Sequence, residues 1–172
     1  MEYKKITAEN KEDLLLPNEP FDLWGQLIVN RKNNVWSYEI ERFKEIETMV
    51  FPNENYEFDQ IHKKGFAMGA YHEEECIGLA IYENHWNKYL YLSDLKVKQA
   101  FRKRGVASQL IKEGLKHAQE LGYSGLYTVG QDNNLTACLF YLKQGFEIGG
   151  FNTRDYDGTK QEGKADVYFY LK

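Results

Sequence analysis

The alternation of hydrophobic and polar positions predicts β-strands along the first hundred residues. Two β-rich runs within 22–43 flank the polar turn RKNN and predict a hairpin. Three further runs, GFAMGAYHE (65–73), CIGLAIYEN (76–84) and KYLYLSDLKV (88–97), are separated by short turns. These three runs predict consecutive antiparallel strands.

The segments around these strands have weaker patterns. Pro17 and Pro20 interrupt the N-terminal region, so the first twenty residues are interpreted as an arm that leads into the fold. Residues 56–64 are compatible with either a short helix or a loop.

The hydrophobic period changes after Gly105. Apolar residues recur at helical spacing over roughly four turns and predict a helix that Gly122 ends. These residues are Val106, Ala107, Leu110, Ile111, Leu115, Ala118 and Leu121. A short buried strand is expected at 125–129, and a second helix is expected at 134–144.

Two closing strands are predicted in FEIGGFNTR (146–154) and ADVYFYL (165–171). The order of elements predicts an α/β fold, with a mixed and mostly antiparallel sheet and helices on its faces. A chain of 172 residues is long enough to bury one substantial core, so a single domain is expected.

Composition narrows the classes of function. The formal net charge is −4 and the pI is near 5.6, so nucleic acid is not an expected partner. No run approaches the length of a membrane span and the N-terminus lacks the apolar core of a signal peptide, so a cytoplasmic protein is expected. Cys76 and Cys138 are expected to be buried thiols, and the four histidines show no metal-ligand spacing.

The junction QAFRKRGVASQL at 99–110 places basic residues at the start of the first predicted helix. The first amides of a helix have no intrahelical partner and carry the positive end of its dipole, so they can bind an anion. Gly105 lets a diphosphate approach the backbone, and Arg102 and Arg104 can add charge-assisted contacts. A solvated helix start would have the same basic residues, and the absence of G-K-[ST] excludes a Walker motif.

A second motif follows one strand after the first helix. NNLTACLFYLKQGF contains the pattern N-x-x-A-x-x-F-Y-x-x-x-G-F, which starts at Asn134 and includes Tyr141. Together with LKVKQAFRKRGVA, this pattern resembles the GNAT superfamily of acetyl-CoA-dependent N-acetyltransferases over roughly residues 65–150. The stretches NEPFDLWGQLI, NHWNKYLYLSDLKV, TVGQDNNLTACLFY and GFEIGG are most similar to its streptothricin acetyltransferase group.

The resemblance implies a GNAT fold in which the central sheet is splayed at the middle strand. It implies substrate-side elements in 1–64, an acetyl-CoA-binding core in 65–150 and C-terminal strands in 151–172. The main chains of Leu95, Lys96 and Val97 are then expected to pair with the pantetheine arm, and one of their amides to polarise the acetyl carbonyl. The diphosphate is expected to bind at Arg102, Lys103, Arg104, Gly105, Val106, Ala107 and Ser108.

The resemblance also implies catalytic roles. Tyr141 is the candidate general acid that protonates the departing thiolate, with packing in the core as the alternative. Asn134 is expected either to hold the cofactor arm or to cap the second helix. Related proteins have an acidic pair in the middle strand, where this chain has Ser93 followed by Asp94. Asp94 is therefore the candidate base or ammonium anchor; a water chain or a surface salt bridge are the alternatives.

The expected function is transfer of acetyl from acetyl-CoA to a primary amine of a cationic small molecule, with streptothricin as the predicted acceptor. No metal or membrane is expected to take part. The alternatives are another amine acceptor or a coenzyme A-binding protein without turnover, and the sequence leaves a homodimer open. Candidate groups beside the acceptor are Glu39, Glu41, Glu83, Asp94, Trp24, Trp36 and Trp86, with solvated acids and core tryptophans as the alternative.

Overall fold

The computed structural model describes all 172 residues, and their contacts group into two compact units. The first unit comprises 1–19, 50–126 and 172, and the second comprises 20–49 and 127–171. None of the helices combines the length and the hydrophobicity needed to cross a bilayer.

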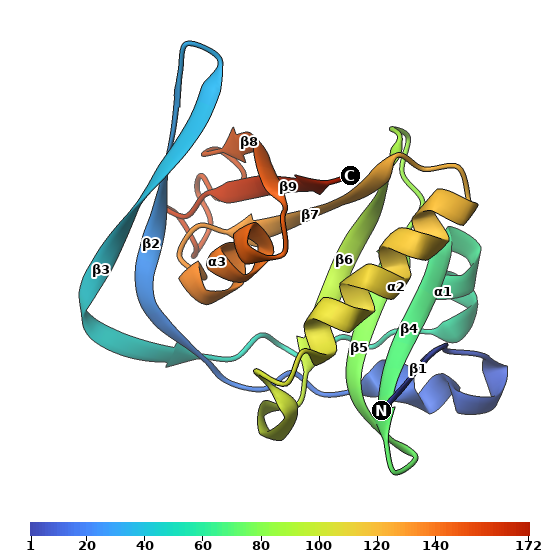
Figure 1. The fold of residues 1–172 in the computed structure, drawn as a ribbon. Helices are drawn as coiled ribbons and strands as arrows, with labels where there is room; N and C mark the ends of the chain where they lie inside the picture. Colours follow the sequence, from blue (N-terminus) through green and yellow to red (C-terminus); the bar gives the residue numbers. More distant parts are fainter. The chain divides into compact units, whose positions relative to one another are not determined.

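Four antiparallel strands form the sheet of the first unit, in the order β1-β4-β5-β6. Its strands are β1 (Glu2–Lys5), β4 (Gly65–His72), β5 (Glu75–Glu83) and β6 (Tyr89–Val97). Its helices are η1 (Ala8–Leu15), α1 (Phe58–Lys64), η2 (Gln99–Phe101) and α2 (Val106–Glu120). Figure 1 shows α2 lying along these strands.

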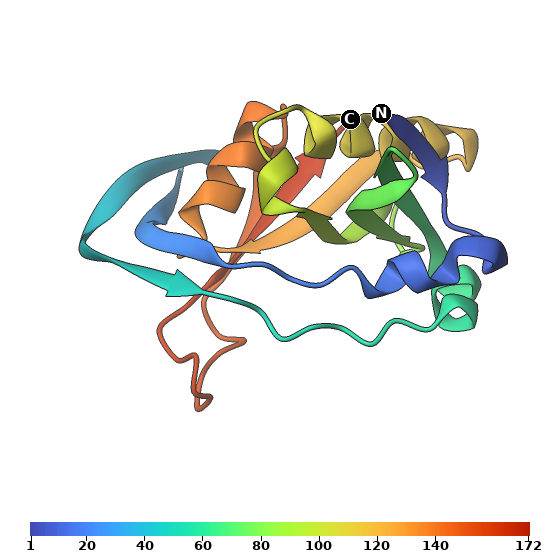
Figure 2. The same ribbon diagram turned by 90° about the horizontal axis from the view of Figure 1, so that it is seen from below.

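Helices cover both faces of this sheet because β4 and β5 are apolar on both sides. The Tyr82 ring lies on the α2 side, where its hydroxyl donates to the Leu110 carbonyl at 2.9 Å. Gly114 of α2 makes room for that ring, since an added Cβ would lie 2.1 Å from it. On the opposite face Leu79 and Ile81 pack in one cluster with residues of η1 and α1. Figure 2 shows α2 on one side of the strands and η1 with α1 on the other.

The second unit contains a long hairpin and a smaller group of strands with one helix. The hairpin is β2 (Phe21–Lys32) and β3 (Val35–Met49), and it turns at Asn33 and Asn34, which both have positive φ. The other elements are β7 (Gly125–Gln131, which starts in the first unit), α3 (Leu135–Lys143), β8 (Glu147–Asn152) and β9 (Asp166–Leu171). Strand β9 lies between β7 and β8.

Asp132 joins the hairpin to the rest of the second unit. The residue is 2% exposed, and its side chain binds two segments through separate oxygens. Oδ2 accepts from Gln26 of β2 at 2.6 Å, and Oδ1 accepts from the Ala165 amide at 3.1 Å. The Asp132 carbonyl also accepts from the Leu27 amide of β2. A buried carboxylate with these partners holds β2 beside the start of α3.

Most predicted elements are confirmed, and two predictions are wrong. The hairpin, the three antiparallel strands, the two predicted helices and both closing strands are present, and 56–64 includes the short helix α1. The first twenty residues are not a plain arm, because 2–5 form the edge strand β1 and 8–15 form η1. The hairpin does not end near 43, since β3 continues to Met49.

Candidate active site

Strand β6 contains an extra residue beside the predicted base. Ile81 of β5 is opposite Asp94 and Tyr82 is opposite Leu92, so Ser93 has no partner in the register. The Ser93 hydroxyl donates to the Ile81 carbonyl at 3.5 Å. Such a β-bulge changes the direction of the side chains that follow it. Asp94 therefore faces the same side of the sheet as Ile81, whereas Leu92 faces the side of Tyr82.

Beyond this bulge the main-chain groups of β6 alternate between the two edges of the strand. The Lys98 amide donates to the Ile77 carbonyl of β5 at 2.9 Å. In an antiparallel ladder every second residue bonds to the same neighbour, so the main chain of Lys96 also faces β5. The main-chain groups of Leu95 and Val97 consequently point to the other edge.

The Asp94 carboxylate lies in a cluster of polar side chains. Its Oδ2 accepts from the Tyr56 hydroxyl at 3.0 Å and lies 3.1 Å from Lys96 Nζ, which also contacts Glu54 Oε2 at 2.6 Å. Burial raises the pKa of Asp94 above its ordinary value; Lys96 opposes this rise and Glu54 adds to it. Burial also raises the pKa of Tyr56, so its hydroxyl stays protonated and acts as a donor.

Helix α2 begins without a side-chain cap. Its N-cap residue is Gly105, which has a left-handed φ of 82° and no atom within 4 Å of the position that a Cβ would occupy. The amides of the first helical turn, at 106–108, therefore have neither an intrahelical acceptor nor a capping side chain. The three basic residues that precede Gly105 are exposed. This end of α2 has the donors and charge that an anion requires.

Arg102 links the start of α2 to β6. Its Nε donates to the Val97 carbonyl at 3.1 Å, and its guanidinium lies 3.8 Å from Glu19 Oε2. The same Glu19 oxygen accepts from the Gln99 amide. Arg102 is thus held beside the edge of β6 to which Val97 points.

Helix α3 carries both predicted residues of the second unit. Asn134 is its N-cap, and Asn134 Oδ1 accepts from the Ala137 amide at 3.3 Å. The capping role, one of the two alternatives, is confirmed. The Tyr141 ring lies among Phe140, Phe146 and Phe169, with centroid separations of 5.4–5.6 Å. The ring is therefore held by aromatic packing, which fixes the direction of its hydroxyl.

A family model, related sequences and solved structures all match this chain to the same family. The model of the acetyltransferase (GNAT) family matches residues 32–146, which is more than half of the chain. The chain belongs to the acetyltransferase (GNAT) family. Streptothricin acetyltransferase A of Bacillus subtilis (strain 168) is 32% identical over 169 residues, which cover 98% of both chains.

Solved structures support the same family. A crystal structure of a candidate streptothricin acetyltransferase from Bacillus anthracis, in complex with acetyl coenzyme A, is 25% identical with a TM-score of 0.87, covering 98% of this chain and 96% of that one. A nourseothricin acetyltransferase is 22% identical with a TM-score of 0.81, covering 99% and 96%, and shows the shared fold. The predicted GNAT fold, with a mostly antiparallel sheet and helices on both faces, is confirmed; splaying of the middle strand stays a prediction.

The acetyltransferase thus divides its predicted site residues between two units. Asp94 to Val97 and 102–108 lie in the first unit, where Val97 and Arg102 are in contact, and Asn134 and Tyr141 lie in the second. Sequence reasoning missed Glu54 and Tyr56 of the first unit, and it gave no individual role to Asn18 and Glu19. One signal was available, since the spacing of Asp94 and Lys96 places both side chains on one face of a strand.

Other candidate groups have roles within the fold. Trp24 Nε1 donates to Thr136 at 2.7 Å, and an arginine of the same hairpin lies over each of the Trp24 and Trp36 rings. Trp86 is 90% exposed.

Cys76 and Cys138 are buried and unpaired, as predicted. No three His, Cys, Asp or Glu side chains are grouped so that they could hold a metal ion.

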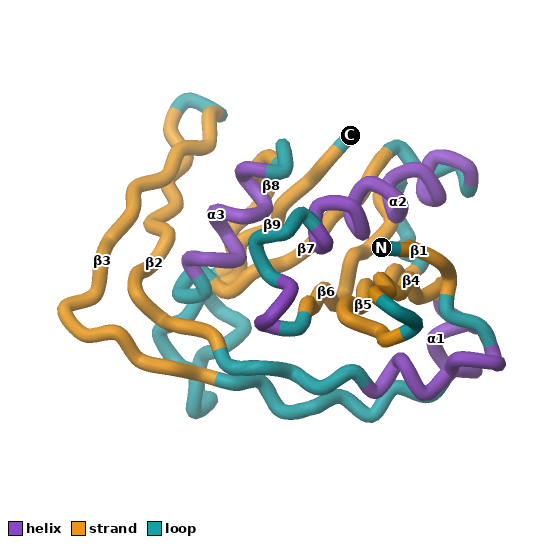
Figure 3. Tube along the Cα trace, turned by 60° about the horizontal axis from the view of Figure 1, so that its bottom comes forward, coloured by secondary structure: helices purple, strands orange, loops and turns teal.

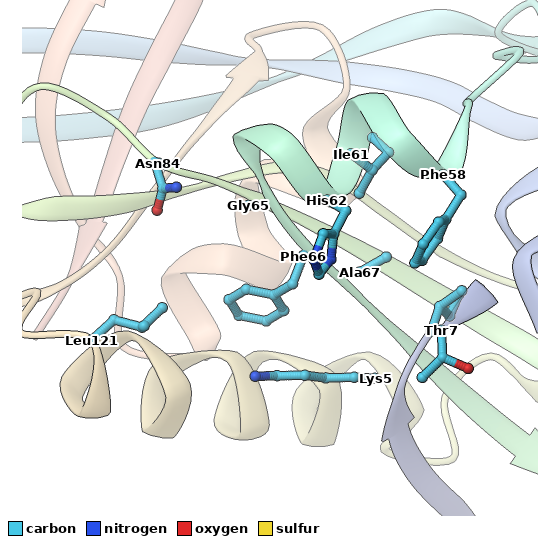
Figure 4. Close-up of a pocket in the computed structure, with 11 residues that line it drawn as sticks. Lys5, Thr7, Phe58, Ile61, His62, Gly65, Phe66, Ala67, Asn84 and Leu121 are labelled. Carbon is cyan, nitrogen blue, oxygen red and sulfur yellow. The ribbon is translucent and has the colours of Figure 1, made fainter.

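A hollow of about 360 Å³ lies elsewhere on the first unit. Its lining includes Phe58 and His62 of α1, Phe66 of β4, Lys5 of β1 and Leu121 after α2. Figure 4 shows these side chains around the gap between α1 and the C-terminal half of α2. None of the residues predicted for acetyl-CoA or for catalysis lines this hollow.

Proposed function

We propose that this acetyltransferase transfers the acetyl group of acetyl-CoA to a primary amine of streptothricin. The observation that carries this proposal is the 32% identity to streptothricin acetyltransferase A along 98% of both chains. Because that match includes the segments before β4, it extends beyond the parts that bind the cofactor. The site residues support the proposal in the following ways.

The start of α2 fits a diphosphate. Its uncapped amides at 106–108 supply several donors in one direction, and the left-handed Gly105 leaves the approach open. Arg102, Lys103 and Arg104 add positive charge around this end of the helix. In the proposed complex Arg102 exchanges its weak contact with Glu19 for a phosphate oxygen.

The main chain of β6 would hold the arm that carries the acetyl group. Leu95 directs its N–H and C=O groups away from β5, and Val97 directs its N–H group the same way, so these groups can pair with an extended amide chain as an added strand does. The Val97 carbonyl already accepts from Arg102 Nε. An amide in this row would also donate to the acetyl oxygen as negative charge develops on it. Lys96 directs its main chain toward β5, so in this proposal it acts through its side chain.

Asp94 and Tyr141 would move the two protons of the reaction. Acetyl-CoA supplies the acetyl group and leaves as coenzyme A thiol. Asp94 would take a proton from the acceptor ammonium, either directly or through a water molecule, so that the amine can attack. As the tetrahedral intermediate collapses, the Tyr141 hydroxyl would give a proton to the departing sulfur, and the nitrogen would lose its second proton, which restores the tyrosine directly or through water. Asp94 would then release its proton to solvent. Asn134 Nδ2 would donate to the cofactor arm while Oδ1 caps α3.

Charge favours a cationic acceptor over an anionic one. The protein has a net charge of −4, and two carboxylates, Asp94 and Glu54, share a single lysine beside β6. A polycationic amine would be attracted to such a region, and attraction of this kind weakens as salt rises.

The proposal is tested by thiol release from acetyl-CoA in the presence of an amine panel. The panel contains streptothricin, a polyamine, an aminoglycoside and a peptide with a free N-terminus. We expect the highest kcat/KM with streptothricin and a product that is heavier by one acetyl group. A higher kcat/KM for another amine would overturn the assignment of the acceptor, and coenzyme A binding without turnover on any amine would overturn the enzymatic proposal.

We also propose that the chain works as a single cytoplasmic domain and as a homodimer. Strand β3 supports a dimer, because Val35, Tyr38, Ile40 and Ile46 are exposed apolar side chains on one strand. The two buried free cysteines support a reducing compartment. A monomer mass in light scattering at micromolar concentration would contradict the dimer.

A further inference from the structure

The ammonium group of Lys96 is almost enclosed by oxygen atoms. It contacts Glu54 Oε2 at 2.6 Å, Asp94 Oδ2 at 3.1 Å and Asn18 Oδ1 at 3.3 Å. The Lys96 side chain is 10% exposed, against 15% for Asp94 and 33% for Glu54. Charged groups at this depth are costly unless they are paired, so Lys96 holds its place through these two carboxylates.

The donors around Asp94 converge on one of its two oxygens. Both the Tyr56 hydroxyl and Lys96 Nζ bind Oδ2, whereas Oδ1 accepts no hydrogen bond from the protein. A carboxylate held through one oxygen presents the other in a fixed direction. This arrangement suits a base, which needs an oriented lone pair that the protein does not already use.

Glu54 is held in place by hydrogen bonds between the segment before β2 and the segment after β3. Asn18 donates through Nδ2 to Glu54 Oε2 at 2.9 Å and to the Pro52 carbonyl at 2.9 Å, and its amide donates to Asn53 Oδ1 at 2.7 Å. Figure 3 shows the two loop segments, before β2 and after β3, running side by side. The Glu54 carboxylate is therefore a fixed part of the first unit.

Glu54 and Lys96 act on Asp94 with opposite sign. The charged and titratable groups that face Asp94 are Lys96 on β6 and Glu54 and Tyr56 from the segment before α1. Burial raises the pKa of Asp94, Lys96 lowers it by favouring the carboxylate, and Glu54 raises it by like-charge repulsion. The net pKa of Glu54 is lowered, since its hydrogen bonds to Lys96 and Asn18 outweigh its burial, so its charge persists.

We propose that Glu54 and Lys96 form a positioning pair that holds Asp94 through Oδ2, presents Oδ1 to the acceptor amine and sets the pH range in which Asp94 accepts a proton. This inference rests on the proposed acetyl transfer. It explains why Glu54 and Lys96, which are far apart along the chain, both lie beside Asp94. It also assigns a role to Asn18, which begins the stretch NEPFDLWGQLI, one of those that carry the family resemblance.

The test compares the pH dependence of kcat/KM in two variants that should move in opposite directions. Lys96→Met removes the positive neighbour, so Asp94 needs a higher pH to ionise and the acid limb shifts upward. Glu54→Gln removes the negative neighbour but keeps an acceptor for Lys96, so the acid limb shifts downward. A purely structural role for the pair predicts lower activity in both variants, with the acid limb of the kcat/KM profile at the same pH as in the wild type.

Two controls accompany these variants. Lys96→Arg retains the charge and should restore the wild-type limb. Lys98→Met removes a lysine near the end of the same strand, which pairs with the exposed Glu75, and should leave the limb unchanged. Thermal melts of every variant show whether it is folded, and Glu54→Gln carries the test if Lys96→Met does not fold.

A readout without substrate separates this inference from the proposed function. The titration of the Asp94 carboxyl carbon is followed by NMR in the free protein and in both variants. Opposite displacements support the pair whether or not streptothricin is acetylated. If the Asp94 titration midpoint is unchanged in both variants, or moves in the same direction in both, the inference is overturned. If the midpoints move in opposite directions but the wild-type enzyme is inactive, only the proposed acetyl transfer is overturned.

Discussion

At the scale of single residues, the structure separates groups that hold a neighbour from groups that face outward. Asp94 uses Oδ2 for Tyr56 and Lys96 and keeps Oδ1 open. Asn134 uses Oδ1 to cap α3 and keeps Nδ2 for another partner. In both residues one polar atom stabilises the fold, and the proposed mechanism uses the other.

Tyr141 has the same two-part character, because its ring packs among phenylalanines while its hydroxyl is the proposed acid. Tyr141→Phe retains the ring and removes only the proton donor. We expect kcat to fall about 100-fold or more, with little change in the dissociation constant of acetyl-CoA. Steady-state kinetics measure kcat, and calorimetry measures the dissociation constant of acetyl-CoA.

The matched control is Tyr123→Phe, which loses a hydroxyl that donates to Asn84; neither residue is among those predicted for catalysis or for acetyl-CoA binding. It should retain wild-type kcat. Equal turnover in the Tyr141 variant would remove this residue from the mechanism.

Sequence reasoning finds residues whose role depends on near neighbours along the chain. Gly105, the basic triplet before it and the cap Asn134 are recognisable because helix ends have local signatures. The other partners of Lys96 are not recognisable in this way, because Glu54 and Asn18 lie 42 and 78 residues before it in the chain. Only the folded chain brings these side chains together.

At the scale of elements, the N-terminus of α2 is the proposed anion site, and its two flanking glycines allow a matched test. Gly105 and Gly122 stand at opposite ends of α2, with φ of 82° and 84°, and each has open space around the position of a Cβ. Alanine at either position must adopt a left-handed conformation, at a cost of about 1 kcal/mol or more in the free energy of unfolding.

We expect Gly105→Ala and Gly122→Ala to lose similar stability in thermal melts but to differ in binding. Only the Gly105 variant adds a Cβ where the diphosphate approaches, so its affinity for coenzyme A should fall about tenfold, or by about 1.4 kcal/mol. Equal affinities of the two variants in calorimetry would contradict the assignment of this helix end.

The bulge in β6 is the element that the sequence does not reveal. The run KYLYLSDLKV alternates well enough to predict a strand, but a bulge depends on pairing with β5. Ser93, where the resemblance leads us to expect an acidic residue, is the extra residue of the bulge. Its effect is that Asp94 and Lys96 share the face of Ile81, whereas Leu92 faces the side of Tyr82.

At the scale of the whole molecule, the hydrophobic pattern predicts the elements that bury a face and misses those that do not. Strand β1 has the sequence EYKK, and three of its four residues are exposed at the sheet edge, so no alternation marks it. Strand β3 continues past 43 because pairing with β2 extends it, although most of its residues are exposed. Tertiary pairing, which a single sequence does not display, decides both cases.

The central claim is that the amides opening α2 bind the diphosphate of coenzyme A, and amide NMR tests it most directly. The protein is titrated with coenzyme A and, in parallel, with pantetheine, which lacks the diphosphate. We predict large shifts of the Val106, Ala107 and Ser108 amide signals with coenzyme A and little change with pantetheine. Saturating coenzyme A that leaves these three signals in place would contradict the account.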